Sequence, residues 1–349
     1  MKKDGATRSR DWVEETMRKI AWRMAALAVA CGLSAGAALA QAKIEIIMTN
    51  EVASTHWKTS EMNQYAEMLA KNSKGRITAK VFPASQLYND RDAVGALGTG
   101  AVHMVWPASV NLEPIDQRVG MLILPFVLSD EIMLKPAFAR DFAKLVSSFT
   151  EPKGIEMLAI LRTADIFFLF KERPIRQVGD LKGQKVRVTG GRILSDLMRA
   201  LGASPVSIAA SEMSMALATG AIDGILTSGS AWARIVGPSA KQASLVPGMS
   251  LLTYTVAVDK KWLDGLPSED RRDIVDTMAE FASTQWAQAI EKDREEVDLM
   301  VKQGGTYWKA TKEQTEPFKK AAESVVKTFS DRYPEAVKAY QDLVNRHGG

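Results

Sequence analysis

The segment DLKGQKVRVTGG, residues 180–191, sets a single arginine inside a short apolar strand that runs into a glycine turn. Arg187 lies between Val186 and Val188, three and four positions before Gly190 and Gly191. A guanidinium in an apolar strand is costly unless an anion meets it, and its planar fork fits a carboxylate or a phosphate. We therefore expect Arg187 to bind a ligand carboxylate; the alternative is an internal salt bridge to an Asp or Glu.

A second segment, ALATGAIDGIL at residues 216–226, repeats the alternation of helix and strand. A helix is predicted to end at Gly220, and a buried strand to run from Ile222 to Leu226. Towards the N-terminus, predicted strands at residues 44–48, 77–82 and 102–106 alternate with predicted helices at 56–73 and 90–97. This alternation indicates parallel α/β layers.

The rest of the chain indicates two lobes that are interleaved rather than consecutive. Strands are predicted at residues 155–162, 166–170 and 251–258, a helix at 193–201, and an almost wholly helical pattern from 268 to about 345. No internal repeat or low-complexity linker separates domains. We expect an α/β fold of the periplasmic binding protein type (type II-like), with two interleaved α/β lobes around a ligand cleft. Lobe I is predicted at 41–164 plus about 253–292, and lobe II at 165–252 plus about 293–345.

The N-terminus has the pattern of a cleaved secretory signal peptide, residues 1–40. A basic segment precedes an uncharged stretch from Met24 to Leu39, and Ala38-Leu39-Ala40 before Gln41 is a small-x-small cleavage signature. Cys31 would be a weaker lipoprotein acceptor. We therefore expect a periplasmic protein.

Charge and cysteine content exclude several classes of function. Removing residues 1–40 takes away seven basic and four acidic side chains, which lowers the formal charge from +4 to +1. Nucleic acid is therefore not an expected partner. The remaining chain has no cysteine, and with three histidines in the whole sequence a metal site is not expected. No cofactor motif is present, and we expect none.

An ordered set of motifs resembles one known family. The set comprises SKGRI (73–77), VFPASQL (81–87), LPFV (124–127), LGASP (201–205) and WLDGLP (262–267), together with the two segments above. Over residues 44 to about 345 the chain resembles the solute-binding proteins of TRAP transporters (DctP family). The resemblance implies an extracytoplasmic receptor, not an enzyme, that binds an organic acid and delivers it to inner-membrane permease subunits. We expect a monomer.

The resemblance also implies that Arg187 grips the ligand carboxylate. In receptors for sugar acids a second arginine follows a glycine some 20 residues upstream, whereas this chain has Ile166-Phe167 there. Arg162 is an alternative second arginine, or else a surface residue. Thr227 is expected to donate one hydrogen bond to the ligand.

Aromatic and histidine side chains at predicted strand ends are further candidates for the ligand site, although core packing is the commoner role of such residues. These candidates are Trp106, Phe167, Trp232, Tyr254 and His56. His56 is equally well explained as a helix cap.

Where receptors for sugar acids follow Asp-Gly with a polar run, this chain has Ile225-Leu226-Thr227. Unpaired ligand hydroxyls would cost about 1–3 kcal/mol each. We therefore expect an apolar or aromatic monocarboxylate, with a hydroxy or keto acid as one form. The alternative functions are a secreted hydrolase or lyase, disfavoured by the absence of G-x-S-x-G and of cysteine, and a sensor subunit of a signalling system.

Overall fold

The first of two β-sheets is built around parallel strands near the N-terminus. The computed structural model describes residues 43–348, so the predicted signal peptide lies outside the described residues. The strand order is β2-β1-β3-β10-β4. Strands β1 to β3 are parallel, whereas β10 is antiparallel to both β3 and β4. The bounds are β1 Ile44–Thr49, β2 Ile77–Phe82, β3 Met104–Val105, β4 Ile155–Asp165 and β10 Leu251–Asp259.

The second sheet has the order β11-β9-β5-β8-β6-β7. Its strand β6 carries Arg187 and is parallel to both neighbours, β7 and β8. Strand β5 is antiparallel to β8 and to β9. The bounds are β5 Phe167–Phe170, β6 Lys185–Val188, β7 Ser204–Ser207, β8 Gly224–Thr227, β9 Gln242–Leu245 and β11 Thr306–Lys309.

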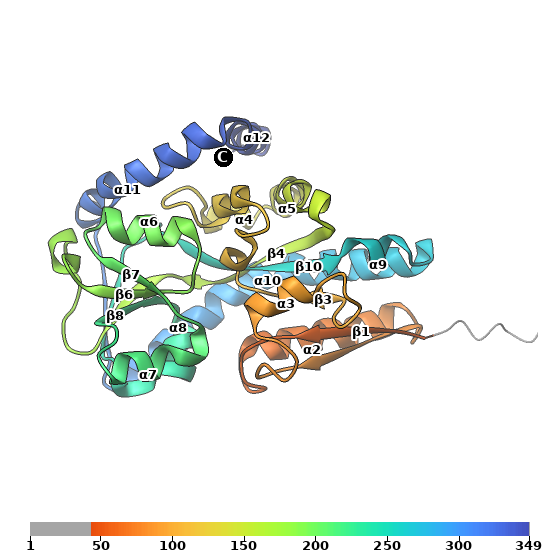
Figure 1. Ribbon diagram of the computed structural model, residues 1–349, viewed down its shortest axis with the longest axis horizontal. Helices are drawn as coiled ribbons and strands as arrows, with labels where there is room; N and C mark the ends of the chain where they lie inside the picture. Colours follow the sequence, from red (N-terminus) through yellow and green to blue (C-terminus); the bar gives the residue numbers. More distant parts are fainter. Residues whose placement is uncertain (1–42, 349) are drawn as a thin grey trace, which may run out of the picture. The chain divides into compact units, whose positions relative to one another are not determined.

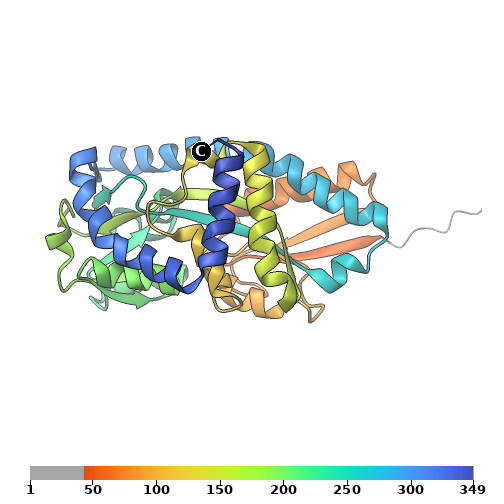
Figure 2. The ribbon, with the colours of Figure 1, turned by 90° about the horizontal axis from the view of Figure 1, so that it is seen from above.

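Two long strands and one long helix connect the regions of the two sheets. Strand β4 leads into β5 with only Ile166 between them, and β10 pairs with β4 along its length. Figure 1 shows these two strands running side by side from one sheet towards the other. Helix α10 has 35 residues and extends along both regions, as the view from above shows (Figure 2).

Helices cover the sheets because each presents an apolar face. In α2, Met62, Tyr65 and Leu69 recur at helical spacing and are fully buried. Helix α5 packs on β4, and α12 packs beside α5 (Figure 2). The bounds are α2 Trp57–Asn72, α3 Asp90–Ala96, α4 Asp130–Met133, α5 Pro136–Thr150, α6 Arg192–Ala200, α7 Met213–Ala218, α8 Gly229–Ala231, α9 Lys260–Asp264, α10 Ser268–Lys302, α11 Lys312–Arg332 and α12 Pro334–Arg346.

Most predicted elements are confirmed, with three differences. The sheets are mixed rather than purely parallel, since β10 and β5 run against their neighbours. The strand predicted at 102–106 is reduced to β3, and the predicted all-helical segment after residue 268 contains β11. Strand β11 pairs with β9 at the edge of the second sheet, a long-range contact that local periodicity cannot reveal.

The residues from Ile44 onward pack as one compact unit, so the predicted lobe boundaries stay a prediction. Two groups of buried apolar side chains lie within this unit. The larger group surrounds the first sheet and α6, and the smaller one includes Phe167, Ile225 and Trp232 of the second sheet region.

Candidate functional site

Arg187 is a buried cation with unused hydrogen-bonding capacity. Its side chain is 2% exposed, and its Nε donates to the backbone oxygen of Ile208 at 2.8 Å. Its Nη2 has no hydrogen-bond partner among the described residues. Burial lowers the pKa of Arg187 to about 10, which leaves the guanidinium charged at neutral pH. A buried cation with a free N–H group indicates a place for an anion.

Arg187 lines a cavity that both sheet regions enclose, with about 570 Å³ of empty space including the part open to solvent. The side chains that line it from the first-sheet region are Glu51, Val52, His56, Asp90, Ala108, Leu252 and Tyr254. Ile166, Thr189, Leu194, Ala210, Met213, Leu226, Thr227, Ser228, Ser230, Ala231 and Ile235 complete the lining.

The wall that faces Arg187 carries two carboxylates, of which one is neutralised. Asp90 at the start of α3 pairs with Lys58 of α2 at 2.6 Å between Oδ2 and Nζ, and both side chains are buried. Lys58 Nζ also lies 4.3 Å from the centroid of the Tyr254 ring. Glu51, two residues after the end of β1, is the second carboxylate. Burial first and Asp90 second raise the pKa of Glu51.

His56 is both a helix cap and a cavity residue. It is the N-cap of α2, where its Nδ1 accepts a hydrogen bond from the backbone N–H of Lys58 at 3.1 Å. Burial, assisted by the charge of Lys58, lowers the pKa of His56 to about 3. The imidazole is therefore neutral at pH 7, and Arg187 is the only cationic side chain among the described residues that line the cavity.

Thr227 and Tyr254 also lie where the sequence predicted. Thr227 ends β8 and is 5% exposed at the cavity, and the hydroxyls of Ser228 and Ser230 follow it. Burial raises the pKa of Tyr254 far above its ordinary value, so its phenol stays protonated. Together with Arg187 and His56, the structure brings four of the eight predicted residues to one cavity.

Arg162 lies in an internal ion-pair cluster and does not line the cavity. Its side chain is 1% exposed and donates from Nε to Asp130 Oδ1 at 2.7 Å. Asp165 and Asp293 accept further hydrogen bonds from the same guanidinium. The surface alternative is therefore wrong for Arg162, and its predicted ligand contact has no support in this arrangement.

Three predicted aromatic residues pack in the core. Trp106 contacts Tyr65 and Phe281 in the larger apolar group. Phe167 and Trp232 form an edge-to-face pair with ring centroids 5.9 Å apart. The Nε1 of Trp232 donates to the backbone oxygen of Ala240 at 2.8 Å, so this indole has no group left for a ligand. None of the three lines the cavity among the described residues.

Sequence reasoning missed Glu51, Asp90 and Lys58. Glu51 could have been found, because it lies two residues after the end of the first strand, and ligands bind at the carboxyl ends of parallel strands. The Lys58–Asp90 pair joins residues 32 positions apart and leaves no local signal.

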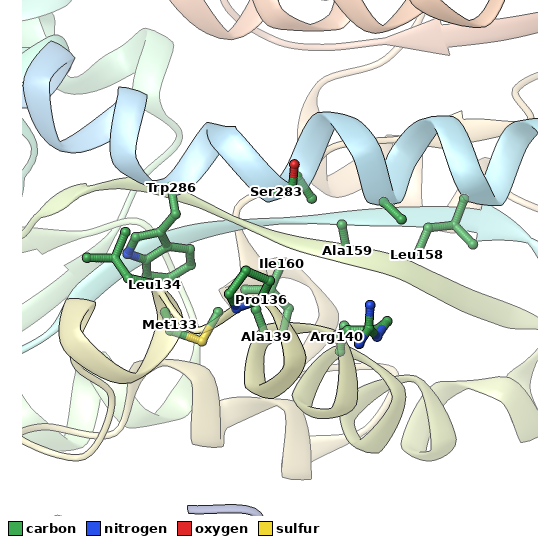
Figure 3. A pocket seen from close by; sticks show the side chains of 13 residues that line it. Met133, Leu134, Pro136, Ala139, Arg140, Leu158, Ala159, Ile160, Ser283 and Trp286 are labelled. Carbon is green, nitrogen blue, oxygen red and sulfur yellow. The ribbon is translucent and has the colours of Figure 1, made fainter. Parts of the chain in front are cut away.

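A second hollow lies between α4, α5, β4 and α10, and Figure 3 shows its lining. It has about 700 Å³ of empty space, and its side chains are apolar apart from Arg140 and Ser283. No unpaired buried polar atom lies among its described lining residues, in contrast to Arg187 in the first cavity. The chemistry therefore points to the cavity around Arg187.

Within residues 43–348 no cluster of three His, Cys, Asp or Glu side chains is arranged to hold a metal ion. In the same part of the chain no helix is long and apolar enough to cross a membrane.

The chain is similar to known solute-binding proteins along most of its length. The family described as "Bacterial extracellular solute-binding protein, family 7" matches residues 48–332. The chain is 31% identical to the C4-dicarboxylate-binding periplasmic protein DctP of Rhodobacter capsulatus, over 70% of this chain and 73% of that protein.

Two solved structures share the fold. A TRAP periplasmic solute-binding protein from Roseobacter denitrificans, with bound β-D-glucuronate, superposes with a TM-score of 0.78 at 21% identity, covering 86% of this chain and 98% of the other. One from Shewanella oneidensis, with bound succinate, has a TM-score of 0.76 at 24% identity, covering 86% and 99%. The two mixed sheets are therefore the periplasmic binding protein fold predicted from the sequence. The chain belongs to the bacterial extracellular solute-binding proteins of family 7, the receptors of TRAP transporters, and it is a solute receptor rather than an enzyme.

Proposed function

We propose that this receptor captures an organic monocarboxylate in the cavity around Arg187 and delivers it to a TRAP permease. The observation that carries the proposal is the buried guanidinium of Arg187, which lines the cavity and whose Nη2 has no partner among the described residues. A ligand carboxylate would fill this vacant hydrogen-bonding position.

The cellular setting follows from the family. TRAP receptors bind small organic acids and work with membrane permease components, and the relatives named above are periplasmic. We therefore place this receptor in the periplasm. A cleaved signal peptide at residues 1–40 and a monomeric state are further parts of the proposal.

The charges around the cavity favour one ligand carboxylate over two. Arg187 is the only cationic side chain in the described lining. Lys58, which does not line the cavity, is already paired with the lining residue Asp90. A second ligand carboxylate would face Asp90 and Glu51 without a cation of its own, and like charges in a poorly solvated site repel. The named relatives bind a C4-dicarboxylate, glucuronate or succinate, so this chain would differ from them in ligand class.

The lining next to Arg187 favours an apolar ligand body. Ile166 and Leu226 both line the cavity. Ile166 lies in the segment where receptors for sugar acids have a second arginine. Phe167 and Ile225 belong to the core instead, so the argument from the sequence rests on Leu226 and Ile166. Several hydroxyl groups and Glu51 also line the cavity, which accommodates a limited number of polar substituents, as in a hydroxy or keto acid.

Ligand capture would close two lobes, the regions of the two sheets, around the cavity. The lining comes from both regions, so one ligand can contact both at once. Contacts made only in the closed arrangement shift the population towards it, and the strands and helix that connect the regions would bend as a hinge.

Calorimetry on Arg187 variants tests the proposal. A thermal-shift screen of organic acids first identifies a ligand, since a ligand at 100 times its Kd adds about 2.7 kcal/mol of stability. Arg187→Ala should then lose about 2–5 kcal/mol of binding free energy, and Arg187→Lys should recover only part, because an ammonium cannot form the bidentate contact. Arg199→Ala is the matched control, because Arg199 is an exposed arginine of α6 outside the cavity lining. Undiminished affinity in Arg187→Ala would refute the carboxylate contact.

A further inference from the structure

The cavity is also lined by a second ionisable side chain, the half-buried carboxylate of Glu51. Glu51 and Arg187 line the same cavity and form no ion pair within 4.0 Å among the described residues, although the backbone N–H of Asp90 acts on the Glu51 carboxylate and lowers its pKa. The two opposite charges therefore face the cavity separately. A ligand placed between them would meet an acceptor on one side and a donor on the other.

The backbone that carries Glu51 is fixed by hydrogen bonds on both sides. The N–H of Glu51 donates to Asp90 Oδ1 at 3.2 Å, and the N–H of Val52 donates to Asn50 Oδ1 at 3.0 Å. A neighbouring loop adds two more bonds, from Ala84 N to the Val52 oxygen and from Ser85 N to the Asn50 oxygen.

This neighbouring loop is strained. Ala84 and Ser85 both have left-handed backbones, with φ of 53° and 55°. Such conformations cost free energy in residues other than glycine, and they persist where the surroundings determine them and commonly at ligand sites. The strain is compatible with a role in holding the Glu51 loop in one position.

Burial and Asp90 raise the pKa of Glu51 by more than Lys58 and Arg187 lower it, so the pKa of Glu51 is raised overall. Asp90 is paired with Lys58, and Arg187 is assigned to the ligand carboxylate. Closure would remove water from Glu51 while Asp90 lies nearby, and burial already raises its pKa. A buried carboxylate is tolerated when it accepts a hydrogen bond from a charged or polar donor, or when it takes up a proton.

We propose that Glu51 selects the ligand: its carboxylate accepts a hydrogen bond from a donor that the ligand carries in addition to its carboxylate, either an ammonium or a hydroxyl group. The inference rests on the proposed function, because it takes the ligand carboxylate to lie on Arg187. An ammonium supplies a hydrogen bond and a charge that balances Glu51, whereas a hydroxyl supplies a hydrogen bond alone. A keto acid offers only acceptors and would face the Glu51 carboxylate unfavourably.

Two sets of four acids with a common body test this selection. The first set is phenylalanine, phenyllactate, phenylpyruvate and 3-phenylpropionate, and the second is the corresponding series with an isobutyl side chain. Within a set that binds, we expect at least one donor-bearing acid, the amino or the hydroxy form, to bind about tenfold or more tightly than the keto and unsubstituted acids. Equal affinities across the set, or tightest binding of the keto acid, would overturn the proposal.

Variants of Glu51 connect the preference to this side chain. Glu51→Gln should reduce the advantage of an amino acid about tenfold or more, since charge is lost, and that of a hydroxy acid by less, since the amide oxygen still accepts. Glu316→Gln, an exposed glutamate of α11 outside the cavity lining, is the control. If Glu51→Gln does not fold, Glu51→Asp should reduce the same advantage by shortening the reach. An unchanged preference in a folded variant would refute the role of Glu51.

Calorimetry in two buffers with different ionisation heats separates the two donor types. The charged groups that act on Glu51 are Asp90, Lys58 and Arg187, and the neutral His56 also lines the cavity. Binding of an amino acid should take up no net proton near neutral pH, while binding of a hydroxy acid should take up a fraction of one proton. Either result supports the subsite when Glu51→Gln removes the preference.

The outcomes distinguish the inference from the proposed function. Loss of binding in Arg187→Ala with an unchanged donor preference in Glu51→Gln would overturn the inference alone. Failure of every acid in both sets to bind, while a dicarboxylate or a uronate binds, would overturn both the proposed ligand class and the selection that rests on it.

Discussion

Glu113 offers a sharp test of how the two sheet regions are held together. This glutamate follows the 3-10 helix at Ser109–Leu112, and its Oε2 accepts a hydrogen bond from the backbone N–H of Arg192 at 2.6 Å, at the start of α6. Its side chain is 4% exposed, and its Oε1 has no partner among the described residues. We expect the side-chain oxygen of Glu113→Gln to accept the same hydrogen bond from the Arg192 N–H, while the variant has no carboxyl group to titrate at this position.

The magnitude follows from the pKa. Burial raises the pKa of Glu113 from 4.5 to about 7, opposed by the backbone N–H groups of Arg192 and Ile193, while Asp196 raises it further. A folded-state pKa above the unfolded value contributes stability that is complete below pH 4.5 and lost as the pH rises through about 7. The limit is about 3.4 kcal/mol, of which about 2.5 kcal/mol is lost between pH 5 and pH 8.

Urea unfolding of the wild type and Glu113→Gln at pH 5, 6, 7 and 8 measures this loss. Other buried carboxyl groups, such as Glu61 with a pKa raised to about 8, contribute to both proteins alike. We therefore expect the difference between the two unfolding free energies to change by about 1–2.5 kcal/mol from pH 5 to pH 8, in favour of the variant at high pH. Parallel pH profiles would refute the buried titration of Glu113, and Glu316→Gln should run parallel to the wild type.

Three further predictions concern the same region. Gly191→Ala should destabilise the fold by more than Gly220→Ala. Both glycines have a positive φ, of 78° and 73°, but a Cβ at Gly191 would collide with Glu113, whereas a Cβ at Gly220 would meet no described heavy atom within 4 Å. Equal losses of unfolding free energy in the two variants would contradict this. Arg187→Met should raise the unfolding free energy of the ligand-free protein by about 1–3 kcal/mol while abolishing binding, and a destabilised variant would argue against the cost assigned to the buried cation. Saturating ligand should lower the radius of gyration in small-angle scattering and be recovered unchanged by mass spectrometry; an unchanged scattering curve would contradict hinge closure.

The sequence predicted the fold well where local pattern and fold agree. The strand at 44–49, the helix at 57–72 and the strand at 77–82 follow from periodicity alone, and the structure places them within one or two residues of the predicted bounds. Strand β11 was missed because its pairing with β9 joins segments about 64 residues apart, and four residues carry too little periodicity to compete with a helical context.

Within the candidate site, the sequence was most informative where one residue breaks a pattern. Arg187 stands out because a cation interrupts an apolar strand, and the structure places it at a cavity. Arg162 also interrupts an apolar strand, but its partners Asp130 and Asp293 lie 32 and 131 residues away in sequence. Sequence alone therefore cannot distinguish an arginine that is free to bind a ligand from one that is paired with carboxylates of the protein.

Ligand recognition in this receptor is tied to groups that lower its stability when the cavity holds only solvent. The fall in the pKa of Arg187 from 12.5 to about 10 corresponds to about 3 kcal/mol of unfavourable burial of its charge. The hydrogen bond from Nε to the Ile208 oxygen recovers only part of this, since Nη2 remains without a partner among the described residues. Burial likewise disfavours the negatively charged form of Glu51, which lines the same cavity. Under the proposed mechanism, a ligand that bridges Arg187 and Glu51 satisfies both groups as the two walls approach each other, so the free energy lost by their burial contributes to closure.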